Sequence, residues 1–555
     1  MFEKNFNVWP TGKPYELPLP QTTHYQNFQR SLEQHPSGYA IIFYDTTITY
    51  AEMEQDVRHL AGWLQQQGVK RGDRVGVYTQ NSPQFVMAYY AALRVGAVVV
   101  PINPMLVEEE LEYIVDNADI KVVFAAVDLH HAFVGVMDRR DIKVVGVKYS
   151  DYLKVETSLP IPDSIAVQPH PDNLTSHAHF TFWQDVIAAG LDAAVVETAM
   201  DDMVLLPYTS GSTGHPKGCV HTNVSVQHAI SALREWFDYT HGDTVLAIAP
   251  MFHVVGMQLG MNVTLASGGT MVILPRWDRE VAAHAIHNYK VTVWPTVPTM
   301  VIDLMNMPDL NDYDTSSLRL MLGGGSSMPE AVAAKLKAQW GITFLEGYGL
   351  TETCCPATTN PPQAPKPQCG GIAHFNTLIQ IVDPVTFTPV ATGELGEIVV
   401  HGPQVMQGYW QDDEANKTAF IMLEGKRYFR TGDLGITDEN GYFFIVDRLK
   451  RMINASGYKV WPTQVEGILY RHPAIAEACV IASKDPKRGE TVKALIVAAE
   501  QYKDVTADDI ILWSREHMAA YKIPRCIEFV DSLPKSGSNK VLWRQLQEAE
   551  NQRTG

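Results

Sequence analysis

The sequence of 555 residues has few cysteines and lacks long apolar runs. Its six cysteines are too sparse for a disulfide scaffold, and none forms a C-x-x-C pair, so we expect reduced thiols and a cytoplasmic location. No run of roughly 18 apolar residues occurs, which argues against a transmembrane helix. The N-terminal residues also lack the basic start and apolar core of a signal peptide.

An excess of basic residues is also lacking. The 44 Lys and Arg residues and 62 Asp and Glu residues give a formal net charge of −18. This balance argues against a protein that binds nucleic acid along a basic face. The charge is unevenly distributed, because residues 447–555 carry 17 basic and 14 acidic side chains. An acidic body is therefore followed by a slightly basic C-terminal part.

Apolar strands alternate with amphipathic helices over most of the N-terminal part. Thr49 and Glu52 have the spacing of a capping box, and a helical pattern of apolar residues follows them. Strands alternating with helices predict parallel sheets covered on both faces. The predicted strands are 74–79, 97–102, 121–126, 203–208, 244–249, 291–294 and 318–322.

The pattern changes after about residue 375. Residues 378–383 and 397–402 indicate antiparallel strands of a small β subdomain, and helices near 463–470 and 507–519 belong to a separate α+β pattern. We predict an α/β fold with a large N-terminal domain of αβ-layered sheets and a β subdomain, followed by a small mobile α+β domain. The predicted parts are a domain at 1–446, a hinge at 447–450 and a lid domain at 451–555.

A loop rich in glycine and hydroxyl residues spans 208–218 and follows a predicted strand directly. Glycine permits close backbone approach, and amide and hydroxyl groups together with Lys217 suit a polyphosphate. The loop is not a Walker A motif, because Lys217 stands between Pro216 and Gly218. A flexible surface loop is the alternative, which the preceding strand and the Pro-Lys-Gly ending disfavour.

Together with other motifs in order, this loop resembles the acyl-adenylate-forming superfamily, most closely its medium- and long-chain fatty-acyl-CoA synthetases. The resemblance covers essentially the whole chain. The motifs are YTSGSTGHPKG at 208–218, PMFH at 250–253, GGG at 323–325, GYGLTE at 347–352, YFRTGD at 428–433, DRLKRMINASGYKVWPTQVE at 447–466 and PKSGSNK at 534–540.

The resemblance implies an AMP-forming acid–thiol ligase with two half-reactions. A carboxylic acid first attacks the α-phosphate of Mg-ATP, which gives an acyl-adenylate and pyrophosphate. A thiol, usually that of coenzyme A, then displaces AMP. Mg²⁺ is the implied metal, and ATP and coenzyme A are the implied co-substrates.

The resemblance also assigns residues to the nucleotide site. Thr351 and Glu352 match positions that contact the α-phosphate and Mg²⁺, with Thr209 as a second metal contact, and Asp433 matches the residue that accepts the ribose hydroxyls. The expected ATP and AMP contacts are Thr209, Ser210, Gly211, Ser212, Thr213, Gly214, Lys217, Gly324, Gly325, Glu346, Gly347, Tyr348, Asp433, Ile445 and Arg448.

Two further side chains are expected to serve the first half-reaction. In the family a lysine at the position of Lys540 bridges the carboxylate and the α-phosphate, although the glycine that usually precedes it is here Asn539. His253 matches an aromatic or histidine position beside the carboxylate; a buried core histidine is the alternative. Asn454 replaces a lysine that luciferases carry, which argues mildly against light emission.

The second half-reaction is expected to involve rotation of the C-terminal domain. In the family the hinge matches Asp447 to Lys450, and a Ser-Gly-Tyr-Lys loop then reaches the active site. Here that loop is Ser456, Gly457, Tyr458 and Lys459.

The segment between His253 and Gly325 is expected to line the acyl pocket. It contains Val254, Met257 and Trp294 and favours an apolar acid, so a fatty acid is the preferred substrate and an aryl acid the alternative. A carrier protein could replace coenzyme A as acceptor, and a nucleotide-binding regulator without catalysis is the non-enzyme reading. A homodimer and transient membrane contact stay open.

Overall fold

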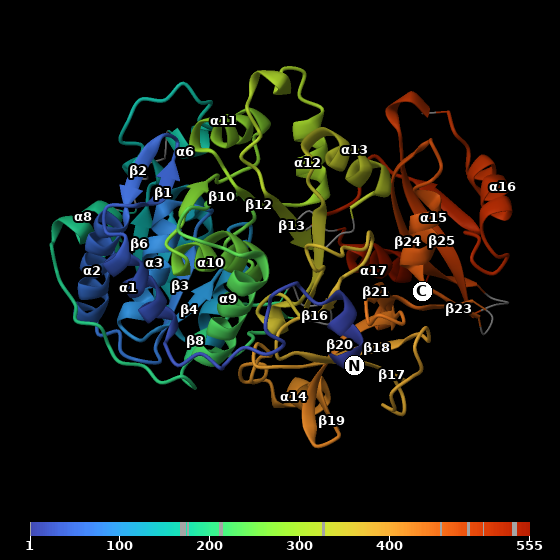
Figure 1. Ribbon diagram of the computed structural model, residues 1–555, viewed down its shortest axis with the longest axis horizontal. Coiled ribbons are helices and arrows are strands. Elements are labelled where there is room, and N and C mark those ends of the chain that lie inside the picture. Colours follow the sequence, from blue (N-terminus) through green and yellow to red (C-terminus); the bar gives the residue numbers. More distant parts are fainter. Residues whose placement is uncertain are drawn as a thin grey trace. The chain divides into compact units, whose positions relative to one another are not determined.

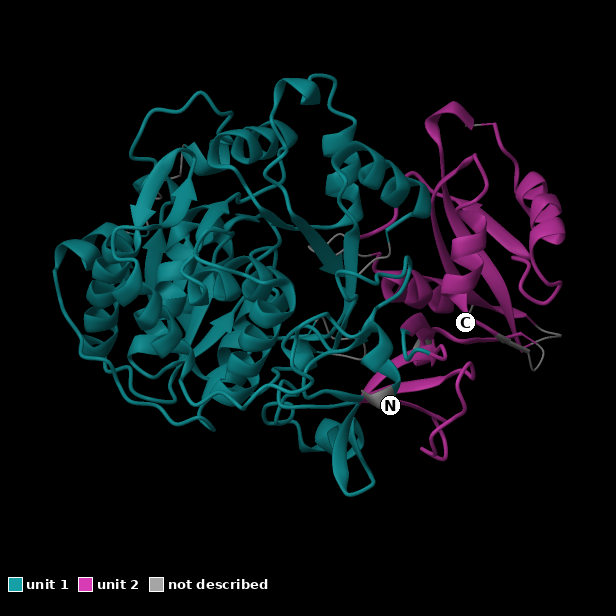
Figure 2. Cartoon of the chain, in the orientation of Figure 1, with its two compact units in different colours: residues 1–378, 400–429, 440–442 teal, residues 379–399, 430–439, 443–555 magenta. Residues whose placement is uncertain are grey.

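The computed structural model describes residues 2–166, 174, 177–209, 215–324, 328–455, 458–485, 489–502, 504–535 and 541–554. The chain divides into two compact units (Figure 2). The first comprises residues 1–378, 400–429 and 440–442, and the second comprises residues 379–399, 430–439 and 443–555. The predicted hinge at 447–450 lies within the second unit.

One large sheet of the first unit has seven strands in the order β7-β6-β5-β3-β4-β8-β9. All neighbouring pairs are parallel except β8 with β9. Its strands are almost continuously apolar, as expected of a parallel sheet buried on both faces. Their bounds are β7 Phe180–Phe182, β6 Lys143–Val147, β5 Ile120–Ala126, β3 Arg74–Tyr78, β4 Val98–Pro101, β8 Met203–Leu205 and β9 His221–Thr222.

The second large sheet of this unit has nine strands in the order β16-β15-β14-β13-β12-β10-β11-β1-β2. Its six central strands are parallel, whereas β2, β15 and β16 pair antiparallel at the edges. Their bounds are β16 Ile372–Ala373, β15 Thr358–Thr359, β14 Phe344–Tyr348, β13 Leu320–Gly324, β12 Val293–Pro295, β10 Thr244–Ala247, β11 Thr270–Ile273, β1 Tyr39–Phe43 and β2 Thr46–Thr49.

Helices pack on both large sheets (Figure 1). The capping box predicted at Thr49 is present, because the amide of Glu52 donates to the Thr49 hydroxyl at 3.2 Å and the amide of Thr49 to the Glu52 carboxylate at 2.7 Å. The helices of this unit are α1 His24–Gln34, α2 Tyr50–Gln66, α3 Pro83–Arg94, α4 Glu108–Ala118, α5 His130–Arg139, α6 Asp163–Ala166, α8 Trp183–Ala188, α9 Asn223–Phe237, α10 Val263–Ala266, α11 Arg279–Tyr289, α12 Pro298–Met305, α13 Glu330–Trp340 and α14 Asp413–Ala419.

A smaller sheet has the order β17-β18-β20-β19, with β21 paired to β20. Strand β20 pairs antiparallel with β19 and with β21. The strands are β17 Leu378–Val382, β18 Gly396–His401, β19 Phe420–Leu423, β20 Lys426–Thr437 and β21 Phe443–Arg448.

The remainder of the second unit has its own sheet and core. The sheet order is β23-β22-β25-β24, with β26 parallel to β25. Its buried core includes Val465, Val480 and Ile496. The elements are β22 Ile453–Ala455, β23 Tyr458–Val460, β24 Ile475–Asp485, β25 Gly489–Ala498, β26 Cys526–Phe529, α15 Pro462–Leu469, α16 Ala507–His517 and α17 Trp543–Thr554. The predicted α/β fold with a small α+β part is confirmed.

None of the helices in the described ranges combines the length and the apolar character that a crossing of the bilayer requires.

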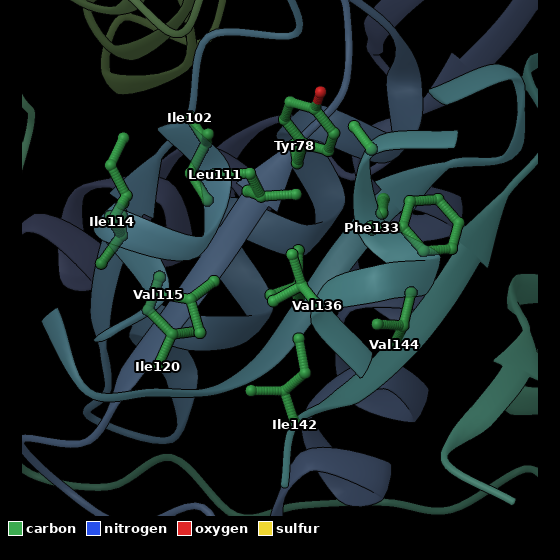
Figure 3. Packing of buried hydrophobic residues seen from close by; sticks show 14 of the residues in the cluster. Tyr78, Ile102, Leu111, Ile114, Val115, Ile120, Phe133, Val136, Ile142 and Val144 are labelled. Carbon is green, nitrogen blue, oxygen red and sulfur yellow. The ribbon is translucent and has the colours of Figure 1, made fainter. Parts of the chain in front are cut away.

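One apolar cluster shows how the seven-stranded sheet is covered (Figure 3). Helices α4 and α5 contribute Leu111, Ile114 and Phe133, which lie against residues of β3, β5 and β6. The ring of Phe133 is 1% exposed and stacks on Phe180 with 6.3 Å between ring centroids. Burial of this cluster fixes both helices on the sheet.

We expect Phe133→Ala to lower the free energy of unfolding by about 3–5 kcal/mol, because it leaves a cavity in this cluster. Met105→Ala is the control, since the Met105 side chain is 57% exposed. Chemical denaturation of the two variants and the wild type measures the difference. Equal stabilities for the two variants would contradict the packing described.

Candidate active site

The two ends of the glycine-rich loop are joined at its base. Tyr208 and Gly218 form an antiparallel β-bridge. The amide of Thr209 donates to the Lys217 carbonyl at 2.9 Å, and the amide of Lys217 lies 3.4 Å from the Thr209 hydroxyl. Thr209 and Lys217 are thus held side by side. Five predicted contacts lie outside the described residues: Ser210, Gly211, Ser212, Thr213 and Gly214.

The Lys217 side chain contacts the segment that precedes helix α14. Its ammonium lies 3.5 Å from a carboxylate oxygen of Asp412 and 5.1 Å from the centre of the Tyr409 ring. A cation over an aromatic face is attracted by the ring quadrupole. The lysine is half-buried, so a basic group is fixed at the base of the loop.

Residues Thr351–Thr353 form a single 3-10 turn after β14, and other segments fix this turn by hydrogen bonds. The Nε2 atom of His221 lies 2.8 Å from the Thr351 carbonyl, and the amide of Met406 donates to the Glu352 carbonyl at 2.8 Å. The Tyr409 hydroxyl donates to the Glu352 carboxylate at 2.8 Å. Thr351 and Glu352 therefore belong to the same cluster as Lys217.

The chain after this turn is strained. Cys354 and Cys355 have φ angles of +50° and +58°, which residues with side chains rarely adopt. The Gln258 amide donates to the Cys354 sulfur at 3.1 Å and accepts from Asn262 at 3.1 Å. Both partners are fully buried. The Gln258–Asn262 pair thus ties the turn to the helical stretch that follows His253.

That helical stretch begins beside His253 and includes a π-helical segment, Gly256–Asn262. A side chain at Gly256 would lie 2.3 Å from the carbonyl oxygens of Ala249 and Pro250, so only glycine fits this contact. His253 is half-buried and accepts from the amide of Val255 at 3.4 Å, which disagrees with a wholly buried core histidine.

The end of strand β13 lies too close to the backbone on both sides for side chains, next to β14 on one side and to the residue after β12 on the other. A Cβ on Gly324 would lie 2.5 Å from the Gly347 carbonyl oxygen, and one on Gly323 would lie 2.0 Å from that of Thr296. The buried Glu346 carboxylate accepts from the amides of Met328 and Gln368 at 3.0 and 3.3 Å. Tyr348 follows at the end of β14 and is half-buried, and Gly325 lies outside the described residues.

Burial raises the pKa of the Glu346 carboxyl, and its backbone hydrogen bonds oppose this effect. The carboxylate holds neighbouring backbone segments in place. Gly324, Glu346, Gly347 and Tyr348 therefore lie together at one end of the nine-stranded sheet, as the strand register requires.

In the second unit, Asp433 and Arg448 are paired. They face each other across β20 and β21, and the Arg448 Nε atom lies 2.9 Å from Asp433 Oδ1. The Asp433 side chain is buried and the Arg448 side chain is half exposed. Ile445 lies on the same strand as Arg448 and is 38% exposed. The structure thus brings three predicted nucleotide contacts together within this unit.

The Asp447 carboxylate accepts two backbone hydrogen bonds, one of them at the start of helix α15. Its carboxylate receives the amides of Arg448 and Thr463 at 2.6 and 2.8 Å, and it is 4% exposed. A carboxylate at a helix N-terminus is stabilised by the free amides there.

Several predicted site residues of this unit belong to the part of the chain that the structure does not describe. Ser456, Gly457 and Lys540 lie outside the described residues, as do the side chains of Lys450, Tyr458 and Lys459. Two antiparallel backbone pairs flank these segments. Ala455 pairs with Tyr458, and Lys535 pairs with Val541.

Sequence reasoning did not single out His221, Met406 or Tyr409. They come from segments about 55 to 130 residues away from Glu352 in sequence, and no local pattern marks them. Gln258 and Asn262 carried a signal, because they interrupt an otherwise apolar stretch. A buried polar side chain needs a hydrogen-bond partner, and here the two amides bond to each other, Gln258 also bonds to Cys354, and Asn262 also bonds to the hydroxyls of two buried tyrosines.

Comparison with known proteins identifies the class to which this fold and site belong. Residues 28–410 match the family described as AMP-binding enzyme, and residues 464–540 match the AMP-binding enzyme C-terminal domain. The chain belongs to the AMP-binding enzyme family.

The chain is similar along its length to several acid–CoA ligases. It is 35% identical to a long-chain-fatty-acid–CoA ligase of Bacillus subtilis, over 98% of this chain and 97% of that protein. It is 34% identical to 4-coumarate–CoA ligase 2 of Oryza sativa subsp. japonica, over 96% and 92% of the two chains. ATP-bound MatB from Rhodopseudomonas palustris superposes with a TM-score of 0.83 at 26% identity, over 96% and 100% of the chains. The protein is an AMP-forming acid–CoA ligase that activates a carboxylic acid by adenylation.

The buried imidazole of His221 makes the stability of this region dependent on pH. Burial lowers its pKa to about 4, whereas an unfolded chain has a value of about 6.5. Between these two pKa values the imidazole is therefore protonated in the unfolded state but not in the folded state. The resulting stability is fully present above about pH 6.5 and is lost as the pH falls towards 4, by about 3 kcal/mol in total.

We expect His221→Asn to reduce the dependence of the unfolding free energy on pH between 6.5 and 4, by about 1.4 kcal/mol per pH unit. Urea denaturation at several pH values measures this slope. Replacing the exposed His131 by Asn serves as a control, with a slope parallel to that of the wild type. If the His221 variant kept the wild-type slope, His221 would not be neutral in the folded state.

Proposed function

We propose that the enzyme converts a medium- or long-chain fatty acid to acyl-AMP with release of pyrophosphate, and then to acyl-CoA with release of AMP. The observation that carries this proposal is the full-length similarity to a long-chain-fatty-acid–CoA ligase, together with the apolar segment after His253. All six cysteines are free, and five of them are buried, as suits the cytoplasmic location that we also propose.

The proposed acyl segment supports an apolar substrate. Val254, Met257 and Trp294 are buried, and the Trp294 ring stacks on Trp277 with 5.6 Å between centroids. An amino-acid substrate would require an acidic partner for its ammonium group. The proposed acyl segment places apolar groups on β12 and on the helical stretch after His253.

For adenylation, the chain supplies cationic and hydroxyl groups where negative charge gathers on the phosphates. We assign Lys217 and Thr209 to the β- and γ-phosphates, and Thr351 to the α-phosphate. Their support is geometric, because the hydrogen bonds at the loop base and the His221 contact hold the backbone of these residues in place. Preorganised groups lower the barrier because they do not need to reorient during the reaction.

The residues present fit a magnesium ion bound together with ATP. Mg²⁺ prefers one or two carboxylates combined with phosphate oxygens over an all-protein cage. Glu352 supplies one carboxylate beside the loop, and the described part of the chain holds no group of three metal-ligating side chains. Glu352 and Thr209 would hold the ion, which neutralises phosphate charge when bound.

We further propose that the Asp433 carboxylate accepts the ribose hydroxyls and that Arg448 keeps this carboxylate oriented. Their ion pair supports this assignment. Ser456 to Lys459 are assigned to the coenzyme A step, and Asp447 to Lys450 to the hinge, both on the family resemblance.

An aryl-CoA ligase is the second candidate. It is favoured by the 34% identity to 4-coumarate–CoA ligase 2, which is almost as high as that to the fatty-acid ligase.

We expect Lys540→Ala to reduce the rate of acyl-adenylate formation about 100-fold or more, because two repelling anions lose their shared cation. Hydroxamate trapping and pyrophosphate release measure this step. Thioester formation from preformed acyl-adenylate should be better retained. Lys535→Ala is the control, since Lys535 forms a partly exposed ion pair with Glu477 at 2.8 Å. Equal adenylation by wild type and the Lys540 variant would refute the assignment.

A panel of acids separates the two substrate classes. We expect kcat/KM for the wild type to rise with fatty-acid chain length, because each buried methylene contributes about 0.8 kcal/mol. Coumarate, ferulate and benzoate should react more slowly, with free coenzyme A as the acceptor. Faster turnover of the aryl acids would select the second candidate. Transfer to a phosphopantetheinyl protein but not to coenzyme A would show that the acceptor is a carrier protein.

A further inference from the structure

Residues Gly408 to Trp410 form a rigid bridge beside the glycine-rich loop. Cys219 and Tyr409 form a β-bridge, the amide of Val220 donates to the Gly408 carbonyl at 3.0 Å, and the amide of Trp410 donates to the Gly218 carbonyl at 2.8 Å. Residues 408–410 are therefore paired through their backbone with residues 218–220, where the chain leaves the loop.

The Asn416 side chain of helix α14 fixes the backbone of Tyr409 from the opposite side. It accepts from the Tyr409 amide at 2.7 Å and donates to the Tyr409 carbonyl at 2.8 Å. A Cβ on Gly408 would lie 2.8 Å from the Asn416 side-chain oxygen, so a larger residue there would displace this side chain. Both backbone polar groups of Tyr409 thus have one defined partner in Asn416.

From this fixed backbone, Tyr409 contacts two groups that we assign to catalysis. Its hydroxyl donates to Glu352 Oε1 at 2.8 Å, and its ring lies under the Lys217 ammonium at 5.1 Å. A hydrogen bond to a carboxylate is charge-assisted and directional. One tyrosine therefore joins the carboxylate of the 351–353 turn to the cation of the loop.

We propose that Tyr409 is a positioning residue of the adenylation step, which orients the Glu352 carboxylate for the metal–ATP complex while its ring supports Lys217. This inference rests on the proposed role of Glu352. It assigns separate tasks to the two parts of one side chain, so the tasks can be separated by experiment.

Tyr409→Phe removes the hydroxyl and keeps the ring. We expect the affinity for ATP in the presence of Mg²⁺ to fall about 10–100-fold, as is usual when a group that orients a metal ligand is lost. Affinity for ATP in EDTA should stay within about threefold, because the Lys217 contact remains. Calorimetric titration of ATP without an acid substrate measures both values.

Two further variants connect the effect to Glu352. In the Glu352→Gln background, Tyr409→Phe should have little additional effect on Mg-ATP affinity, since residues that act through each other are not additive. Asn416→Ala keeps the hydroxyl but loosens its backbone, and should weaken Mg-ATP binding in the same direction by a smaller factor. In turnover assays, Tyr409→Phe should need more Mg²⁺ for pyrophosphate release, with KM for the acid unchanged.

Tyr78→Phe is the matched control, because the buried Tyr78 likewise donates its hydroxyl in a hydrogen bond, but to the Leu106 carbonyl at 2.6 Å and not to a carboxylate. Wild-type Mg-ATP affinity in Tyr409→Phe would overturn the proposal, as would an equal loss with and without the metal. If the wild type adenylates no acid, the proposed function fails, while the binding titrations still decide the role of Tyr409.

Discussion

The close backbone contact between strands β13 and β14 is the constraint on which the site depends. At Gly324 the carbonyl oxygen of Gly347 stands where a side chain would be, so these two strands can pair in this register only with glycine at this position. The register fixes where β14 ends, and therefore where the turn at Thr351–Thr353 begins. The position of the Glu352 carboxylate follows from a contact between glycines several residues away.

The rest of the site is held by groups that hydrogen-bond to backbone. His221 and Met406 each hydrogen-bond to a main-chain carbonyl of the turn, and Glu346 accepts from two main-chain amides. Such contacts hold a polar turn in place from several directions. The two αL cysteines after the turn show that the surrounding structure determines this conformation against local preference.

Much of the fold could be predicted from the sequence, because its signals are local. The strand at 74–79 and the helix after Thr49 are visible as apolar runs and a capping box, and both are present as β3 and α2. The order of motifs was sufficient to indicate the family and the two-part reaction. The contacts of Tyr409 with Glu352 could not be predicted, because 57 residues separate them and tyrosine in a Gly-Tyr-Trp segment has no special spacing.

The sequence by itself determined the class of reaction through the identity and order of its motifs, and it predicted Lys217, Glu352 and Asp433 as site residues. The tertiary structure decided which side chains support them. It paired Asp433 with Arg448, placed the Lys217 ammonium over the Tyr409 ring, and tied Gln258 to Cys354. The physical reason is that hydrogen bonds and ion pairs act only over a few ångströms, and distant segments reach that range only after the sheets have packed.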